Sequence, residues 1–332
     1  MTPVACAEVE PERWDEVLRT AGVSDVYYAR SFVAASAALV DAEPVLLRLA
    51  GGTGDVFFAC LVRHGPTDVT TPYGYGGPVG AGEDPPLAEF PAAYNAWCEG
   101  RGVVASFVVF HPLLGNAATP AATAFRRQAL AGTVAWPLGG PELLPAMHRH
   151  HRRLVRRAAA AGYEVRVQPS PPELGEFVGV YQQSMRRAGA APFYLFPPRY
   201  WSALLDGVRL VRVDVRAEGG TLIAGVLGMG DPPWLHYHLG GAADAARGTG
   251  ASHLALYRLA EWGREQGYEQ LHLGGGVGGR DDSLLEFKLR FAPRGLVPAA
   301  IGKAVHDRAA YLRLAGATAV DWEAFFPAYR AP

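Results

Sequence analysis

The order of predicted secondary structure repeats once along the chain, and this repeat limits the possible folds more than any other feature. Alternating apolar and polar runs, separated by glycine, proline and N-cap residues, predict two passes of strand, two helices, three strands, helix and strand. Such a repeat indicates the tandem duplication of one α/β (α+β) fold. We expect a first domain at 1–145, which the segment 308–332 could complete, and a second domain at 146–307.

Length, composition and charge narrow the class of protein. The 332 residues are 49% apolar and 19% charged, which is typical of a folded protein with two domains. A formal net charge of −1 gives no overall basic field, so we expect no DNA partner, and any nucleic-acid contact requires a local patch. We expect no membrane span, because the sequence has no apolar run of about 18 residues, and the N-terminus lacks a signal-peptide pattern. The three distant cysteines predict neither disulfides nor a metal site, so we expect a cytoplasmic protein.

The stretch Leu271–Pro293 joins a predicted strand, a glycine-rich loop and an amphipathic helix. Gly274, Gly275 and Gly276 remove side chains where the strand ends, which leaves bare backbone to face a ligand. Lys288 lies close to the apolar side of the helix. Its ammonium either extends to solvent or is held over the loop as a fixed positive charge, and the sequence leaves both positions open.

A loop in the first pass, TDVTTPYGYGGPVGAG, carries Tyr73 and Tyr75 among glycines and prolines. Aromatic side chains with a polar end suit stacking or hydrogen bonding to a polar ligand, and a packed turn is the other interpretation.

A basic amphipathic helix is predicted in MHRHHRRLVRRAAAAG, from Met147 onward. At about 100° per residue, one face carries arginines and the opposite face carries apolar side chains. The arginines are Arg149, Arg152, Arg153, Arg156 and Arg157, and the apolar residues are Met147, Leu154 and Ala158. The arginine face is either a solvated surface or a surface that contacts phosphates. His148, His150 and His151 have no carboxylate or cysteine ligand at helical spacing, so we expect no metal.

The element order, with a glycine loop before a long helix, resembles the GCN5-related N-acetyltransferase (GNAT) fold, whose loop amides bind the pyrophosphate of coenzyme A. A doubled version resembles the Fem family, the aminoacyl-tRNA-dependent transferases that build peptidoglycan cross-bridges, and their relatives in peptide-antibiotic pathways. The stretches that carry the resemblance are PYGYGGP at 72–78, RHHRRLVRRAAAAG at 149–162, YQQSMRRAGAAPFY at 181–194, LHLGGG at 271–276 and DSLLEFKLRF at 282–291. The coenzyme A loop pattern is matched only in part, by Ala245–Gly250 or Arg247–Ser252, and no coiled-coil arm is inserted in the second pass.

This resemblance implies two GNAT-like domains, each a mixed, mainly antiparallel sheet flanked by helices. It places Phe287 and Lys288 at the catalytic position, where a positive charge stabilises the oxyanion formed as an amine attacks the aminoacyl ester. It also matches Arg187, or else Arg186, to an arginine that binds phosphates of the acceptor. The candidate substrate-binding residues are Arg186, Arg187, Tyr194, Tyr73, Tyr75, Tyr237, Gly274, Gly275 and Gly276.

Three functions are consistent with these features. The first is an aminoacyl-tRNA-dependent transferase that forms an amide on a peptide, peptidoglycan-precursor or antibiotic-intermediate acceptor, with or without phosphate groups, and needs no cofactor. The second is an N-acyltransferase that uses acetyl- or acyl-coenzyme A, and the third is a non-catalytic ligand- or RNA-binding module. Asp281, Asp282 and His238 are the available general bases, and each also has a structural interpretation, as a helix cap or an outward strand residue. A Ser-His-Asp hydrolase is not expected, because no GxSxG motif is present.

Overall fold

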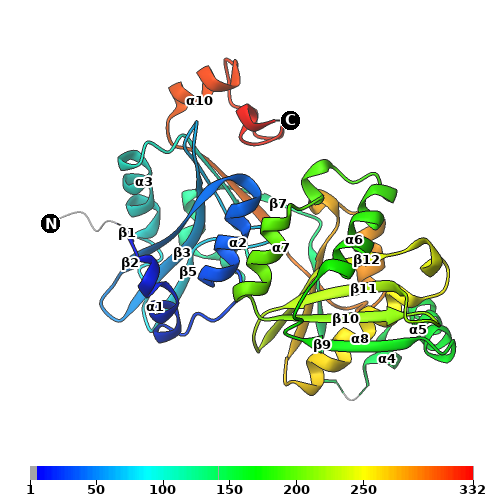
Figure 1. Ribbon diagram of the computed structural model, residues 1–332. Helices are drawn as coiled ribbons and strands as arrows, with labels where there is room; N and C mark the ends of the chain where they lie inside the picture. The colour runs from blue at the N-terminus through cyan, green and yellow to red at the C-terminus, as the bar shows by residue number, and fades with distance from the viewer. Residues whose placement is uncertain (1–5, 141, 332) are drawn as a thin grey trace. The chain divides into compact units, whose positions relative to one another are not determined.

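The chain folds into two units, each built around one mixed β-sheet flanked by helices (Figure 1). The computed structural model describes residues 6–140 and 142–331. The chain divides into one unit of Met1–Leu130 with Pro298–Pro332 and a second unit of Ala131–Val297. The predicted α/β fold class is confirmed.

The first unit is an eight-stranded sheet with its helices. Its elements are β1 (Ala7–Glu8), α1 (Trp14–Thr20), α2 (Arg30–Val40), β2 (Ala42–Ala50), β3 (Gly54–Arg63), β4 (Asp68–Thr70), β5 (Val79–Gly82), α3 (Phe90–Gly100), β6 (Ala105–Val109), β7 (Arg126–Ala129), β15 (Ala300–Val305) and α10 (Arg308–Ala315). The strand order is β1-β2-β3-β4-β6-β15-β7, and β5 pairs with β3. Strands β4 and β6 run parallel, and the crossover between them passes through β5 and α3.

The second unit repeats this pattern around a seven-stranded sheet. Its elements are β8 (Thr133–Pro137), α4 (Leu143–Ala146), α5 (Arg149–Ala160), β9 (Glu164–Pro169), α6 (Gly175–Arg187), α7 (Pro198–Gly207), β10 (Leu210–Arg216), β11 (Leu222–Met229), β12 (Trp234–Ala242), α8 (Ala251–Glu265), β13 (Gln270–Gly275), α9 (Ser283–Leu289) and β14 (Leu296–Val297). The strand order is β14-β8-β13-β12-β11-β10-β9. The parallel pair is β12 and β13, with α8 as its crossover, so the two units share one topology around the crossover helix.

The boundaries between the units differ from the predicted ones at 145 and 307. Strand β8 pairs with β13 and β14, so residues 131–145 belong to the second unit. The last part of the predicted second domain, 297–306, is divided between the sheets, since β14 pairs with β8 whereas β15 pairs with β6 and β7. The local sequence pattern shows that these strands exist, but it does not contain their distant pairing partners.

Helices cover both faces of the second sheet. On one face, Val213 of β10 is buried in an apolar cluster with Leu259 of α8. On the other face, α6 lies so close that a Cβ at Gly225 of β11 would be 3.0 Å from Phe177. Glycine at this position therefore lets α6 approach the sheet.

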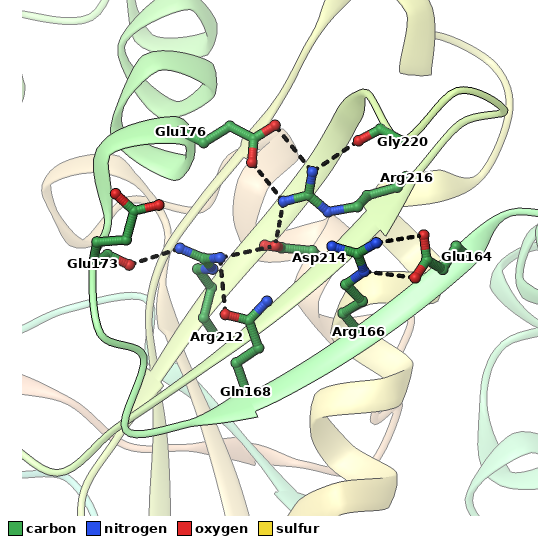
Figure 2. A network of polar contacts seen from close by, with 9 residues as sticks. All are labelled: Glu164, Arg166, Gln168, Glu173, Glu176, Arg212, Asp214, Arg216 and Gly220. Carbon is green, nitrogen blue, oxygen red and sulfur yellow. Dashed lines mark hydrogen bonds and ion pairs between the residues drawn. The ribbon is translucent and has the colours of Figure 1, made fainter.

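A buried ion network fixes the beginning of α6 to β10 (Figure 2). Arg212, Asp214 and Arg216 alternate along the strand and therefore share one face. Both arginines contact the Asp214 carboxylate, at 3.2 and 2.9 Å. Arg216 also donates to both carboxylate oxygens of Glu176, at 3.0 and 2.5 Å, and Arg212 donates to the carbonyl of Glu173 at 2.7 Å. The network thereby fixes the helix that carries Arg186 and Arg187 at its other end.

One helix differs from its predicted extent in a way that matters for the site. Helix α9 ends at Leu289, whereas the sequence predicted that it continues to Pro293. In residues 6–140 and 142–331, no helix is both long enough and apolar enough to cross a membrane.

Candidate active site

The glycine-rich loop after β13 is tied to the beginning of α9 by Asp282. The carboxylate of Asp282 accepts hydrogen bonds from the backbone N–H groups of Leu284 and Leu285, at 3.0 and 2.9 Å, which makes it the N-cap. It also accepts one from the N–H of Val277 at 2.8 Å. These backbone bonds lower the pKa of the Asp282 carboxyl, with the bond from Leu285 the largest cause. Asp282 therefore has a structural role as a cap, and it sets the position of the loop relative to Lys288.

The ammonium of Lys288 is held over this loop. Its Nζ donates to the carbonyl of Gly275 at 2.6 Å and lies 5.9 Å from the ring centre of Tyr237. The residue is only 7% exposed. Of the two positions that the sequence leaves open, the structure shows the one in which the charge is fixed inside the protein.

Burial makes this lysine unusual. Burial lowers the pKa of Lys288 from 10.5 to about 8, although the negative charge of Asp282 raises it slightly. At pH 7 the side chain therefore still carries its positive charge. Burial also raises the pKa of the neighbouring Tyr237 to about 12, so its hydroxyl remains protonated. The site can present a cation to a developing oxyanion without losing a proton first.

Lysine is rare in this chain. Only two of its 31 lysine and arginine residues are lysines, Lys288 and Lys303, and both are buried. Lys303 belongs to the first unit, where it donates to the carbonyl of Trp322. Arginine thus supplies the surface charge, while lysine occurs only at buried positions, one of which has a strongly lowered pKa.

Backbone packing explains the glycines of the loop. Gly274 has φ of +75°, which favours glycine. A Cβ at Gly275 would lie 2.8 Å from the carbonyl oxygen of Gly132, and one at Gly276 would lie 2.2 Å from that of Arg280. Their binding role stays a prediction, whereas their role in forming this tight turn is visible in the structure.

A pocket of about 340 Å³ lies at the beginning of α8. It is lined by Leu154, Arg187, Ala242, Ala243, Ala246, Arg247, Gly248, Gly250, Ser252, His253 and Phe287. Arg187 is fixed in this wall by Asp244 at 3.0 Å and by the carbonyl of Ala242 at 2.6 Å. Phe287, the residue before Lys288, forms another part of the wall. The pocket therefore combines cationic and apolar groups at a helix N-terminus, which suits a ligand with phosphate and ring components.

The predicted basic helix is α5, and it packs beside α8. Arg149, Arg153, Arg156 and Arg157 are exposed and Arg152 is half-buried. Within the described part of the chain, none of these five arginines forms an ion pair with a carboxylate. Their charges remain available to an external polyanion.

The opposite face of α5 differs in part from the predicted apolar stripe. Met147 and Ala158 are buried as expected, but Leu154 is half-buried and lines the pocket. The other buried positions are Val155 and His151. The N-cap of α8 lies close to this part of α5, since a Cβ at Gly250 would lie 2.5 Å from the Leu154 carbonyl oxygen.

The candidate tyrosines lie in three different settings. Tyr73 and Tyr75 belong to the first unit, where both are half-buried and Tyr75 packs edge-on against Tyr27. In the second unit, Tyr237 lies beside Lys288, and the carbonyl of Tyr194 accepts a hydrogen bond from Tyr181 at 2.9 Å. The structure thus brings Tyr237, Gly275 and Phe287 together around Lys288.

The sequence interpretation did not identify the roles of three histidines in the second unit. His238, expected as an outward strand residue, is half-buried and contacts the hydroxyl of Tyr200 at 2.7 Å, and burial lowers its pKa to about 3. His151 and His253 pack edge to face, with ring centres 4.4 Å apart. In the sequence, His151 stands out only as part of the histidine cluster next to the arginines, for which no metal was expected, and His238 and His253 are not part of that cluster.

Residues 146–288 match the acetyltransferase (GNAT) domain family. This match covers the pocket, the basic helix and Lys288, so the second unit is similar to a GNAT domain over most of its length. No curated protein sequence matches the chain.

Three solved structures share the fold over nearly the whole chain. FemX is similar with a TM-score of 0.62 and 14% identity, over 93% of this chain and 99% of that chain. L-PGS from Bacillus licheniformis has a TM-score of 0.59 and 16% identity, over 91% and 93% of the two chains. A tandem GNAT protein from the clavulanic acid biosynthesis pathway has a TM-score of 0.54 and 12% identity, over 91% and 98%. The chain therefore has the tandem GNAT fold of the Fem type, and the predicted resemblance is confirmed at the level of the fold.

Proposed function

We propose that this protein is an aminoacyl-tRNA-dependent aminoacyltransferase that forms an amide bond on the amine of a small acceptor. The observation that carries the proposal is the combination, within one GNAT unit, of a buried ammonium and an uncompensated arginine face. The fold shared with FemX supports it. The acceptor class is a peptide, a peptidoglycan precursor or an antibiotic intermediate, and the protein acts in the cytoplasm, where charged tRNA is available.

In the proposed reaction, the acceptor amine attacks the carbonyl carbon of the aminoacyl ester. A C–N bond forms, the carbonyl oxygen becomes anionic, and the Lys288 ammonium stabilises that charge from its fixed position over Gly275. When the tetrahedral intermediate collapses, the C–O bond to the ribose breaks and the ribose oxygen accepts the proton from the amine, with the adjacent ribose hydroxyl as a shuttle. The products are the amide and deacylated tRNA, and no cofactor is required.

The donor is best accommodated along α5 and the pocket at the beginning of α8. The pocket volume of about 340 Å³ suits a terminal nucleoside, with Arg187 and Arg247 available to phosphate. Arginines that continue along α5 can contact further phosphates of an acceptor stem. In the first unit the corresponding helix is α3, and three acidic residues precede it, Glu83, Asp84 and Glu89. Their negative charges disfavour a phosphate at the N-terminus of that helix, so we place the donor on the second unit.

An acyl-coenzyme A donor is the alternative, and one observation favours it. The loop before α8 carries Arg247, Gly248 and Gly250, which is part of the pattern that binds pyrophosphate in coenzyme A-dependent GNAT enzymes. This alternative leaves the arginines of α5 without a partner.

A comparison of donors tests the proposal. The protein is incubated with a metabolite extract and either tRNA charged with labelled amino acids or labelled acetyl-coenzyme A, and the Lys288→Met variant serves as the control. We expect a product whose mass equals acceptor plus aminoacyl residue, and whose formation is abolished by ribonuclease and by Lys288→Met. A product from acetyl-coenzyme A alone would establish the alternative, and binding of charged tRNA without any product would indicate a non-catalytic module.

A further inference from the structure

His151 has a buried side chain in the second unit, and the proposed reaction gives this side chain no role. It lies on α5, is 1% exposed, and places its Nε2 atom 3.0 Å from the carbonyl oxygen of Phe287. A carbonyl oxygen can only accept a hydrogen bond, so Nε2 must carry the proton. Burial is the main cause that lowers the pKa of His151 to about 3, and the nearby His253 adds to it. The ring is therefore neutral, and only Nε2 is protonated.

The end of α9 requires donors from outside the helix. The last carbonyls of a helix have no partner within it, and α9 ends at Leu289. The N–H of Phe291 donates to Lys288 rather than to Phe287, so the Phe287 carbonyl depends on the ring of His151. The N–H of His148 donates to the neighbouring carbonyl of Arg290 at 2.9 Å. The beginning of α5 thus satisfies two carbonyls at the end of the helix that bears Lys288.

Packing alone does not explain a histidine at position 151. The ring lies 4.6 Å from that of Phe291 and 5.1 Å from that of Phe287, which are contacts that phenylalanine could also make. The Nδ1 atom of His151 is buried and has no hydrogen-bond partner among residues 6–140 and 142–331. An unpaired buried nitrogen destabilises the folded state, so a side chain used only for packing would be better apolar. The hydrogen bond from Nε2 accounts for the imidazole.

We propose that His151 is a positioning residue for Lys288. Its Nε2–H holds the carbonyl of Phe287, while Asp282 caps the other end of the same helix, so both ends of α9 are fixed. The ammonium of Lys288 then stays on the carbonyl of Gly275 and does not reach solvent. The catalytic meaning of this role rests on the proposed function, but the positioning itself does not.

The test uses two variants of His151 and one matched control. His151→Phe retains the ring packing and removes the donor, while His151→Gln retains an amide N–H near the position of Nε2. His150→Phe is the control, because His150 is the adjacent residue and no described contact of its side chain reaches α9. The readouts are turnover and the titration of Lys288, followed by NMR of lysine labelled with ¹⁵N. The chain has only two lysines, and Lys303→Arg assigns their signals.

Loss of the hydrogen bond should release the end of α9 and admit water to the ammonium. In His151→Phe we expect the pKa of Lys288 to rise by about one pH unit or more toward its ordinary value. We also expect kcat to fall about 10-fold while KM for the donor stays constant, because a displaced ammonium affects the transition state more than binding. His151→Gln and His150→Phe should retain both wild-type values. Two groups face Lys288, namely Asp282 and Tyr237. Both are intact in every variant, so they cannot produce the difference.

An unchanged Lys288 titration in folded His151→Phe would overturn the proposal. If that variant does not fold, ¹⁵N NMR of the wild-type histidines decides instead. We expect His151 to be neutral with the proton on Nε2 between pH 5 and 9, despite its neighbours His253, His150 and Arg290. A proton on Nδ1 or an imidazolium would refute the role. Full turnover of Lys288→Met would refute the proposed function instead, and the lysine titration would still decide the role of His151.

Discussion

Replacement of Lys288 by methionine should make the protein more stable at pH 7, although it removes the residue proposed for catalysis. A pKa lowered from 10.5 to about 8 means that the folded state holds the charged form at a cost of about 3 kcal/mol relative to the unfolded chain. Methionine has a similar length and no charge, so this cost disappears. Loss of the hydrogen bond to Gly275 offsets about 1 kcal/mol of the gain. The expected net increase in the free energy of unfolding is about 2 kcal/mol.

The pH dependence identifies the cause. Between the folded pKa of about 8 and the unfolded pKa of 10.5, the unfolded chain binds more protons at Lys288 than the folded protein does. The wild-type protein is therefore stabilised as the pH rises through this window, and the variant receives no such contribution. By pH 10 the contribution reaches about 2 to 3 kcal/mol, which removes the advantage of the variant.

Urea denaturation at pH 7 and at pH 10, followed by tryptophan fluorescence, measures both effects. Arg153→Met is the matched control, because it removes a cation that is exposed, and its stability should change little at either pH. A Lys288→Met variant that is less stable than wild type at pH 7 would refute the argument. So would a gain of the same size at both pH values.

Three further perturbations test other parts of the account. When Arg152, Arg153 and Arg156 are replaced together by glutamine, the slope of log affinity for tRNA against log salt concentration should become smaller by about two to three. An unchanged slope would mean that the arginine face of α5 is only a solvated surface. Arg187→Ala should raise KM for the donor more than KM for the acceptor, because Arg187 and the loop before α8 line the same pocket. The opposite result would support the role in binding acceptor phosphates that the family resemblance implies. Asp214→Asn should lower the free energy of unfolding by about 3 to 5 kcal/mol, since two buried arginines would lose their shared carboxylate, and a loss below about 1 kcal/mol in urea denaturation would contradict this.

The sequence predicted the fold well where the information was local. The repeated element order and the glycine loop before Lys288 both follow from periodicity and from turn residues. The boundaries of the units did not follow, because β8 and β15 pair with strands far away in the chain. Strand pairing depends on three-dimensional contacts that a local pattern does not contain.

The candidate site shows the same limit at the level of side chains. A lysine near the apolar side of a helix could be extended or buried, and only the position of the Gly275 carbonyl decides between them. In the basic helix, periodicity placed most arginines correctly, but it assigned Leu154 to the core and gave His151 no role. Both differences arise from the close approach of α5 to its neighbours α8 and α9, which are distant in sequence.

The most direct test of the central claim is the single-turnover rate of amide formation by Lys288→Met. The protein is saturated with aminoacyl-tRNA and mixed with the acceptor identified in the donor comparison, so that neither binding nor product release limits the rate. The account predicts a rate about 100-fold or more below that of wild type, with the affinity for charged tRNA unchanged, because the variant loses one group that stabilises the oxyanion. A rate equal to that of wild type in the folded variant would contradict the role of Lys288 and the proposed chemistry with it.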